Sequence, residues 1–187
     1  MRRDPARAGS PGKLAPVTGE LPASPLPASA GRVLDAAADL GLAIEVRAFP
    51  AGTRTADDAA RAIGCDVSQI VKSLVFRIDD EVVLALVSGS NRLDEAKLAT
   101  VAGVAPDAVG RADADAVRAA TSYAVGGVPP FGHPTPLRTW VDLDLLDHDV
   151  VWAAAGTPTH VFSVAPRELV AATGAVPTDL AVRGPAS

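Results

Sequence analysis

The sequence contains very little cysteine and few aromatic residues. Cys65 is the only cysteine in 187 residues, which excludes an intramolecular disulfide framework and a zinc site of the CxxC type. Aromatic residues make up 4% of the chain, so Val, Leu, Ile and Ala must fill the core. Apolar runs are also short, and none approaches the roughly 20 residues that a membrane span requires.

The amino-terminal residues and the net charge narrow the choice of function. The opening MRRDPARAGSPGKLAP contains basic residues but no apolar segment, which is not the pattern of a secretory signal. We therefore expect a cytoplasmic protein. The formal net charge is -5 and the isoelectric point is near 5.1. Proteins that grip nucleic-acid backbone usually carry a basic excess, so any contact with RNA should be small and local.

Residues 1–30 differ in composition from the rest of the chain. Six prolines alternate there with Ala, Ser and Gly, and the absence of any helical or strand period predicts a disordered, Pro/Ala-rich tail. Four basic residues against two acidic ones leave a second interpretation open, a basic arm that contacts RNA. We expect one globular domain over residues 31–180 and a flexible carboxyl-terminal end over residues 181–187.

Periodicity and capping residues predict a mixture of helices and strands in this domain. Thr55 and Asp94 precede two predicted helices as N-caps, and Asp79-Asp80 joins two β-rich runs as a hairpin turn. The polar turn Ser88–Arg92 is expected to cap the helix that follows it. Hairpin-linked strands favour an α+β fold, a single domain with a mixed, mostly antiparallel sheet and flanking helices. The predicted helices cover residues 32–40, 56–63, 94–102, 112–120 and 167–173, and the predicted strands cover 43–49, 69–78, 81–88, 123–125, 139–143, 150–154 and 160–163.

Motifs of several common enzyme classes are absent. The sequence has no GxGxxG after a strand, no GxxxxGK[ST], no HExxH and no GxSxG. His133, His148 and His160 are far apart, and a metal-dependent hydrolase that uses all three is the weakest interpretation. Cys65 has no neighbouring base in the sequence, so we expect it to pack rather than react.

Lys72 is the most informative single residue. Strand alternation over Ile70–Phe76 places it on one face with Ile70, Leu74 and Phe76, which we expect to be the core side. An ammonium on such a face must snorkel, pair with other groups or point into a cleft. The pattern alone leaves two interpretations open, a snorkelling lysine near the sheet edge and a functional group in a cleft.

The segment Val125–His133 is rich in glycine and proline. Gly126 and Gly127 allow the backbone to approach a ligand closely, and Pro129-Pro130 fixes the exit of the loop. Such a loop can serve as an oxyanion hole or a phosphate cradle if its N–H groups are exposed, and we then expect both Gly126 and Gly127 to present their N–H groups to a substrate. Otherwise it is a structural turn, and a smaller version occurs at Gly156.

Several of these segments occur together, in the same order, in one known family. The set comprises Thr55–Ala60 (TADDAA), Gln69–Phe76 (QIVKSLVF), Gly126–His133 (GGVPPFGH) and the Gly156 turn followed by Ala165–Leu169 and Thr173–Ala175. Over about residues 31–178 the chain therefore resembles the YbaK / prolyl-tRNA-synthetase-associated domain family. The Pro-rich tail lies outside the resemblance.

The resemblance implies an enzyme that edits mischarged tRNA and so protects translation fidelity. Members hydrolyse the ester between a wrong amino acid and the 3′-terminal adenosine, either in trans or as a domain of prolyl-tRNA synthetase. A trans-editing deacylase for a small amino acid such as Cys, Ala or Ser is thus expected. No cofactor, metal or covalent nucleophile is implied. The alternative is a non-catalytic module of the same fold that binds tRNA or a synthetase.

The resemblance also implies which residues form the site. Lys72 and Gly126 are the implied catalytic residues. The implied substrate contacts are Gly127, Val128, Pro130 and Gly156. The expected partners are the 3′ end of aminoacyl-tRNA and, as a candidate, prolyl-tRNA synthetase, and neither DNA nor a membrane is expected.

Overall fold

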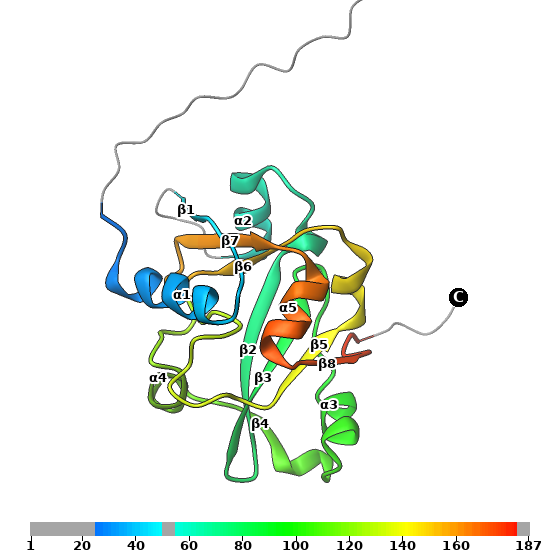
Figure 1. Cartoon of the computed structure of the whole chain (residues 1–187). Coiled ribbons are helices and arrows are strands. Elements are labelled where there is room, and N and C mark those ends of the chain that lie inside the picture. Colours follow the sequence, from blue (N-terminus) through cyan, green and yellow to red (C-terminus); the bar gives the residue numbers. More distant parts are fainter. Residues whose placement is uncertain (1–24, 50–54, 183–187) are drawn as a thin grey trace, which may run out of the picture.

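Two β-sheets and five α-helices make up the described part of the chain, residues 25–49 and 55–182 of the computed structural model (Figure 1). The larger sheet has the strand order β4-β2-β3-β5-β8, and the smaller has the order β1-β7-β6. The predicted α+β class is confirmed, with the strands divided between two sheets. The strands are β1 (Val46–Ala48), β2 (Val71–Ile78), β3 (Glu81–Ser88), β4 (Val109–Arg111), β5 (Thr139–Asp142), β6 (Val151–Ala154), β7 (His160–Val164) and β8 (Val176–Thr178).

The β2–β3 hairpin is the centre of the larger sheet. These strands are antiparallel along their whole length, around the predicted turn Asp79-Asp80. On its other side, β2 pairs with β4 only along Phe76–Ile78. β5 and β8 add to the opposite edge in parallel. Within the described ranges, the first half of β2 therefore has no strand partner on the side away from β3, apart from a single bridge between Ile70 and Trp152.

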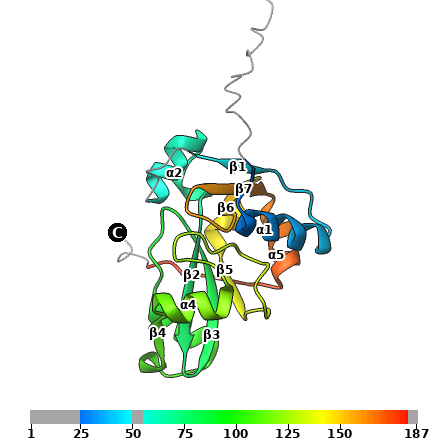
Figure 2. The same cartoon turned by 90° about the vertical axis from the view of Figure 1, so that its left-hand side faces the viewer.

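That bridge joins the larger sheet to the smaller one. β7 is antiparallel to both β6 and β1. The smaller sheet and α2 (Ala56–Ile63) lie at one end of the molecule, whereas the β2–β3 turn lies at the other (Figures 1 and 2). The unpartnered start of β2 thus faces a region where several elements converge.

The helices begin where the sequence supplies caps. Thr55 accepts a hydrogen bond from the Asp58 amide, and the Asp58 side chain accepts one from the Thr55 amide, which forms a capping box at the start of α2. Asp94 and Asp113 accept hydrogen bonds from backbone N–H groups of the first turn and so cap α3 (Glu95–Ala102) and α4 (Ala114–Thr121). The remaining helices are α1 (Ala28–Asp39) and α5 (Pro166–Thr173), and in the described ranges no helix has the length and hydrophobicity that a membrane crossing needs.

The larger sheet is covered on both faces. Val71 and Val75 of β2 belong to one buried cluster, which also contains side chains of α1, α4, α5 and the smaller sheet. Phe76 and Ile78 belong to a second cluster, together with Leu98 of α3. The predicted core face of β2, which carries Phe76, is buried against α3. The prediction that this is the one buried face is wrong, because α1, α4, α5 and the smaller sheet cover the opposite face, which carries Val71 and Val75.

Other boundaries also differ from the prediction. α1 begins at Ala28, inside the predicted tail, and β1 covers only Val46–Ala48 of the predicted strand 43–49. Residues 123–125 form a turn rather than a strand, and β4 and β8 were not predicted. Ala181, in the predicted flexible end, is buried and bridges to Leu93. The predictions for residues 1–24 and 183–187 lie outside the described residues.

Candidate functional site

A cavity of about 620 Å³ lies where β2, α2 and the smaller sheet converge. Its wall combines the start of α2, the first residues of β2, the turn before Val128, and residues of β6 and β7. The lining is mostly apolar, with a few polar side chains among the alanines, valines and prolines. The lining residues are Thr55, Ala56, Ala59, Ile70, Val71, Lys72, Ser73, Leu74, Val125, Gly126, Val128, Trp152, Ala154, Thr157, Pro158, His160 and Val161.

Lys72 lines this cavity beside Ile70 and Leu74, in the position that the cleft interpretation predicts. Its side chain is half-buried, and Nζ donates to the carbonyl oxygen of Gly89 at 3.2 Å and to that of Asn91. Burial lowers the pKa of Lys72, because an ammonium loses hydration there.

Charged groups around Lys72 modify this effect. The positive charge of Arg111 lowers the pKa of Lys72 further, whereas the carboxylates of Asp142 and Asp57 raise it. In the described residues the ammonium is therefore held by two backbone carbonyls, and the carboxylates act on it as nearby charges. Its predicted catalytic role stays a prediction.

The glycine loop reaches the cavity through a tight turn. Gly127 N–H donates to the carbonyl oxygen of Ala124 at 3.0 Å, and Gly126 has a φ of +85°, a conformation that favours glycine. We expected both Gly126 and Gly127 to present N–H groups to a substrate. For Gly127 this is wrong, because the turn already uses its N–H. Among the described residues, the Gly126 N–H has no hydrogen-bond partner.

Three of the predicted site residues line the cavity and three do not. Lys72, Gly126 and Val128 belong to the lining. The other three, Gly127, Pro130 and Gly156, are buried outside the lining. Their predicted role as substrate contacts stays a prediction.

The two glycines outside the lining bring backbone segments close together. A Cβ on Gly127 would lie 2.7 Å from the Cα of Thr157, and a Cβ on Gly156 would lie 2.6 Å from the carbonyl oxygen of Ser29. Both distances are shorter than real Cβ contacts. These glycines therefore allow the Gly126 turn, the Gly156 turn and α1 to pack against one another.

His133 forms a hydrogen bond with the end of the glycine loop. Its Nε2 lies 2.9 Å from the carbonyl oxygen of Pro129, which can only accept, so Nε2 carries the proton. Burial lowers the pKa of His133, which favours the neutral ring. Tyr123 donates from its hydroxyl to the carbonyl oxygen of Gly132 at 3.3 Å. The structure thus gives His133 a supporting position.

Several residues with polar groups lie in the cavity wall although the sequence did not predict them there. His160 Nδ1 lies 2.6 Å from the hydroxyl of Thr157 and 3.2 Å from that of Thr159. Trp152 presents its ring to the cavity while the Arg47 guanidinium lies 5.3 Å from the ring centroid. The Ser73 hydroxyl is buried and has no hydrogen-bond partner in the described ranges. Only His160 had a sequence signal, its place directly after the Gly156 turn.

Metal and thiol chemistry find no support in the described residues. There, no three His, Cys, Asp or Glu side chains gather as a metal site would require. Cys65 is partly buried, and this burial is the main reason that its pKa is raised, with the Asp66 charge adding to it. A raised pKa favours the protonated thiol over the thiolate, which is the reactive form.

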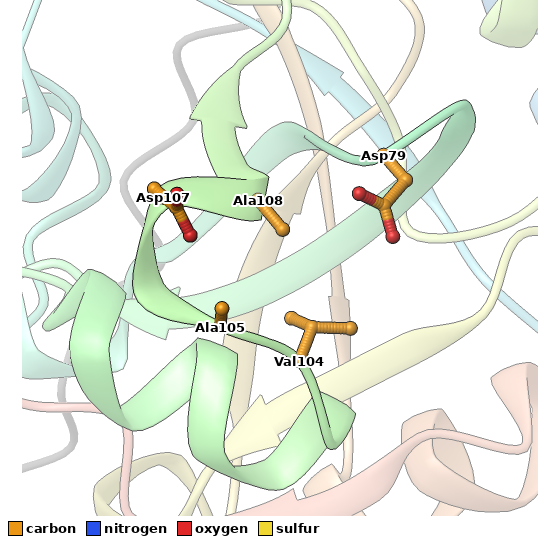
Figure 3. A pocket seen from close by; sticks show the side chains of 5 residues that line it. All are labelled: Asp79, Val104, Ala105, Asp107 and Ala108. Atoms are coloured by element: carbon orange, nitrogen blue, oxygen red, sulfur yellow. The ribbon is translucent and has the colours of Figure 1, made fainter.

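A second hollow, of about 450 Å³, lies beside the β2–β3 turn (Figure 3), which is the end of β2 away from Lys72. Its lining combines Asp79 of the β2–β3 turn with Asp107 and small apolar residues between α3 and β4. None of the predicted site residues lies there.

Comparison with known proteins assigns the family. The sequence model of the aminoacyl-tRNA editing domain matches residues 50–172, a range that contains Lys72, the glycine loop and every residue that lines the cavity. The chain therefore belongs to the aminoacyl-tRNA editing domain family.

The chain is also similar to proteins of two kinds. The uncharacterized protein YwhH of Bacillus subtilis (strain 168) is 29% identical over 126 residues, which are 67% of this chain and 78% of YwhH. The proline--tRNA ligase of Thermoanaerobacter sp. (strain X514) is 32% identical over 117 residues, 62% of this chain but only 20% of the ligase. The matched part of the chain thus spans about a fifth of the synthetase relatives' length.

A solved structure is similar over nearly the whole described chain. The crystal structure of a proposed trans-editing enzyme for prolyl-tRNA synthetase is 46% identical, with a TM-score of 0.81, and the similarity covers 85% of this chain and 100% of that one. The predicted fold of an editing domain is thereby confirmed.

Proposed function

We propose that the protein hydrolyses the ester bond of mischarged aminoacyl-tRNA, in trans, when the tRNA carries a small amino acid such as Cys, Ala or Ser. The observation that carries this proposal is a single cavity of about 620 Å³ lined by both Lys72 and Gly126. The similar structure of a proposed trans-editing enzyme for prolyl-tRNA synthetase supports tRNA for proline as the substrate and that synthetase as a partner.

Hydrolysis of this ester requires few functional groups from the protein. Water adds to the ester carbonyl, the bond between that carbon and the ribose oxygen breaks, and the ribose hydroxyl regains its proton. An activated ester of this kind needs a positioned water and stabilisation of the developing oxyanion. The neighbouring ribose hydroxyl of the substrate can hold the water, so no side-chain nucleophile is required.

Lys72 supplies the positive charge for the end of the tRNA. Two of its three N–H donors are held by backbone carbonyls, and the third is available to the terminal phosphate or ribose. An acidic protein can thus bind a polyanion through one local contact.

Gly126 supplies the oxyanion donor. Its N–H belongs to the outer peptide of the turn, because the N–H of Gly127 closes that turn on Ala124. Removal of one aligned donor typically costs on the order of 10²–10³ in turnover. Val128 and the apolar wall limit the size of the amino acid, as a second sieve does.

A deacylation assay with a panel of mischarged tRNAs tests the proposal. We expect release of Ala, Ser or Cys from tRNA for proline, well above the rate without enzyme, and no release of proline from the same tRNA. If the protein binds these tRNAs without release of any amino acid, it is a non-catalytic binding module and the proposal is wrong.

A further inference from the structure

The turn after β3 is built around the side chain of Asn91. Its Nδ2 donates to Asp142 Oδ2 at 2.6 Å and to Asp144 Oδ2 at 2.7 Å. Asp142 is the last residue of β5 and is fully buried. One amide group therefore fixes the turn to the end of a central strand.

The same turn is fixed on its other side by close packing. Gly89 N–H donates to the carbonyl oxygen of Ile70 at 2.7 Å, and a Cβ on Gly89 would lie 2.1 Å from the carbonyl oxygen of Val67. The Ser88 hydroxyl donates to the carbonyl oxygen of Ser68 at 2.8 Å. The backbone from Ser88 to Asn91 thus has little room to shift towards residues 67–70, which directly precede β2.

The carbonyl oxygens of this turn are the ones that hold Lys72. Nζ donates to Gly89 O and to Asn91 O. An ammonium has three N–H bonds in tetrahedral directions, so two fixed acceptors determine where the third N–H points. The Ser88 N–H also donates to Asp142 Oδ2, at the longer distance of 3.4 Å, but the Asn91 amide makes the short bonds that join the far end of the turn to β5. The position of the Asn91 carbonyl therefore depends on the Asn91 side chain.

We propose that Asn91 is a positioning residue for Lys72: its side-chain amide, held between Asp142 and Asp144, sets the two carbonyls that orient the ammonium towards the cavity. This inference rests on the proposed deacylase function for its kinetic consequence only. The charged groups that face Lys72 are Asp142 at the end of β5, Asp57 of α2 and Arg111 at the end of β4. The carboxylate of Asp144 meets the same amide.

Two substitutions distinguish the effect of the orientation of Lys72 from the effect of the negative charge near it. Asn91→Ala removes the amide anchor and leaves the facing charges unchanged. Because Lys72 is proposed to contact the terminal phosphate or ribose, kcat/KM for deacylation should fall at least tenfold. Asp142→Asn keeps the shape and an acceptor oxygen but removes a negative charge that raises the pKa of Lys72. Relative to the variant's own rate near neutral pH, the loss of activity at alkaline pH should begin at a lower pH than in the wild type, after subtraction of the rate without enzyme.

Ser90→Ala is the matched control in the same turn. Ser90 is exposed, and its hydroxyl lies 3.0 Å from that of Ser88. Within the described residues it has no hydrogen bond to either carboxylate, and it reaches the Asn91 side chain only through a long hydrogen bond to Oδ1 at 3.4 Å. We expect an unchanged kcat/KM and an unchanged pH profile. A similar loss of rate in Ser90→Ala and Asn91→Ala would show that the turn is merely fragile and would overturn the proposal.

A second measurement needs no tRNA and so remains informative if the deacylase function is wrong. The chain has three lysines, so its Nζ–H signals can be assigned by ¹⁵N NMR of lysine-labelled protein. We expect a protected Nζ–H signal for Lys72 in the wild type and its loss in Asn91→Ala. The signal of Lys97, which donates to Asp179 and to the Ala181 carbonyl at 2.7 Å each, should persist in both.

Either of two results would overturn the proposal. One is a Lys72 Nζ–H signal equally protected in wild type and Asn91→Ala. The other is a wild-type chain in which Lys72 exchanges freely while Lys97 is protected. The second result is decisive even if Asn91→Ala does not fold. Absence of deacylase activity together with loss of the Lys72 signal in Asn91→Ala would reject the proposed function and keep the positioning role.

Discussion

Gly127 lies so close to Thr157 that a Cβ on this glycine would come within 2.7 Å of the Thr157 Cα and within 2.9 Å of its backbone N and C. The atoms in contact belong to the backbone rather than to the end of a flexible side chain, so neither loop can make room without moving its main chain. The contact joins the turn that contains Gly126 to the segment that carries His160, and both segments line the cavity. The shape of the cavity therefore depends on the absence of one methyl group.

Gly127→Ala should damage both stability and activity. The added Cβ must push two loops apart, and forced overpacking of this kind typically costs about 1–3 kcal/mol. We expect a lower free energy of unfolding in chemical denaturation and a loss of deacylation in the same variant. A variant with wild-type stability would show that the two loops yield easily, against this account.

Gly126→Ala should separate activity from stability. The nearest atom to a Cβ there is Pro158 Cγ at 3.8 Å, so only the positive φ of +85° is costly, at about 1 kcal/mol. Gly103 is a matched control, with a φ of +78°, no atom within 4 Å of its Cβ position and a place at the end of α3, outside the cavity lining.

Both alanine variants should lose about the same stability, by the estimate for a positive φ. Deacylation should fall on the order of 10²–10³-fold in Gly126→Ala only, because an aligned donor is twisted away there. Single-turnover rates with saturating enzyme measure this. Equal rates in the two variants would make the Gly126 turn purely structural.

His133 should make stability depend on pH below neutrality. Burial lowers its pKa in the folded chain from the ordinary value of 6.5, so the unfolded chain takes up the proton first as pH falls. The free energy of unfolding therefore decreases as pH falls from about 6.5 towards the lowered pKa, and this group has no effect above that range.

His133→Gln tests the predicted direction of this pH dependence. Glutamine can still donate to the Pro129 carbonyl but does not titrate. Denaturation curves from pH 5 to pH 8 should show a shallower loss of stability in the variant than in the wild type. Parallel curves would mean that His133 does not contribute to the pH dependence.

Elements with local signals could be predicted from the sequence, and elements formed by distant contacts could not. The Thr55 capping box, the Asp94 cap and the Asp79-Asp80 turn give α2, α3 and the β2–β3 hairpin nearly to the residue. β4 and β8 have three residues each, too few for an alternating pattern. Their strand character comes from pairing with β2 and β5.

Two errors have specific physical causes. α1 begins at Ala28 directly after Pro27, with no side-chain cap, so the helix start looks like the continuation of the Pro-rich tail. Residues 123–125 alternate as a strand would, but the Gly127 N–H closes a turn on Ala124. In both cases the deciding interaction is made by the backbone and leaves no mark in the side-chain pattern.

The site could be predicted only in part for the same reason. Lys72 was identifiable because a charge stood on an apolar strand face. Asp142, whose charge acts on Lys72, is bonded to Asn91 although the two residues are 51 positions apart in the chain. Trp152 lies next to the start of β2 because it forms a bridge with Ile70. Contacts across two sheets are set by the assembled fold, and no spacing in the sequence records them.

The most direct test of this account is the deacylation rate of Lys72 variants on tRNA for proline charged with Ala, Ser or Cys. Lys72→Met keeps an unbranched apolar stem in the cavity wall and removes the ammonium, and Lys72→Ala removes both. The account predicts that both variants lose most of the activity while their melting temperatures stay close to that of the wild type. Wild-type turnover in a folded Lys72→Met variant would contradict it.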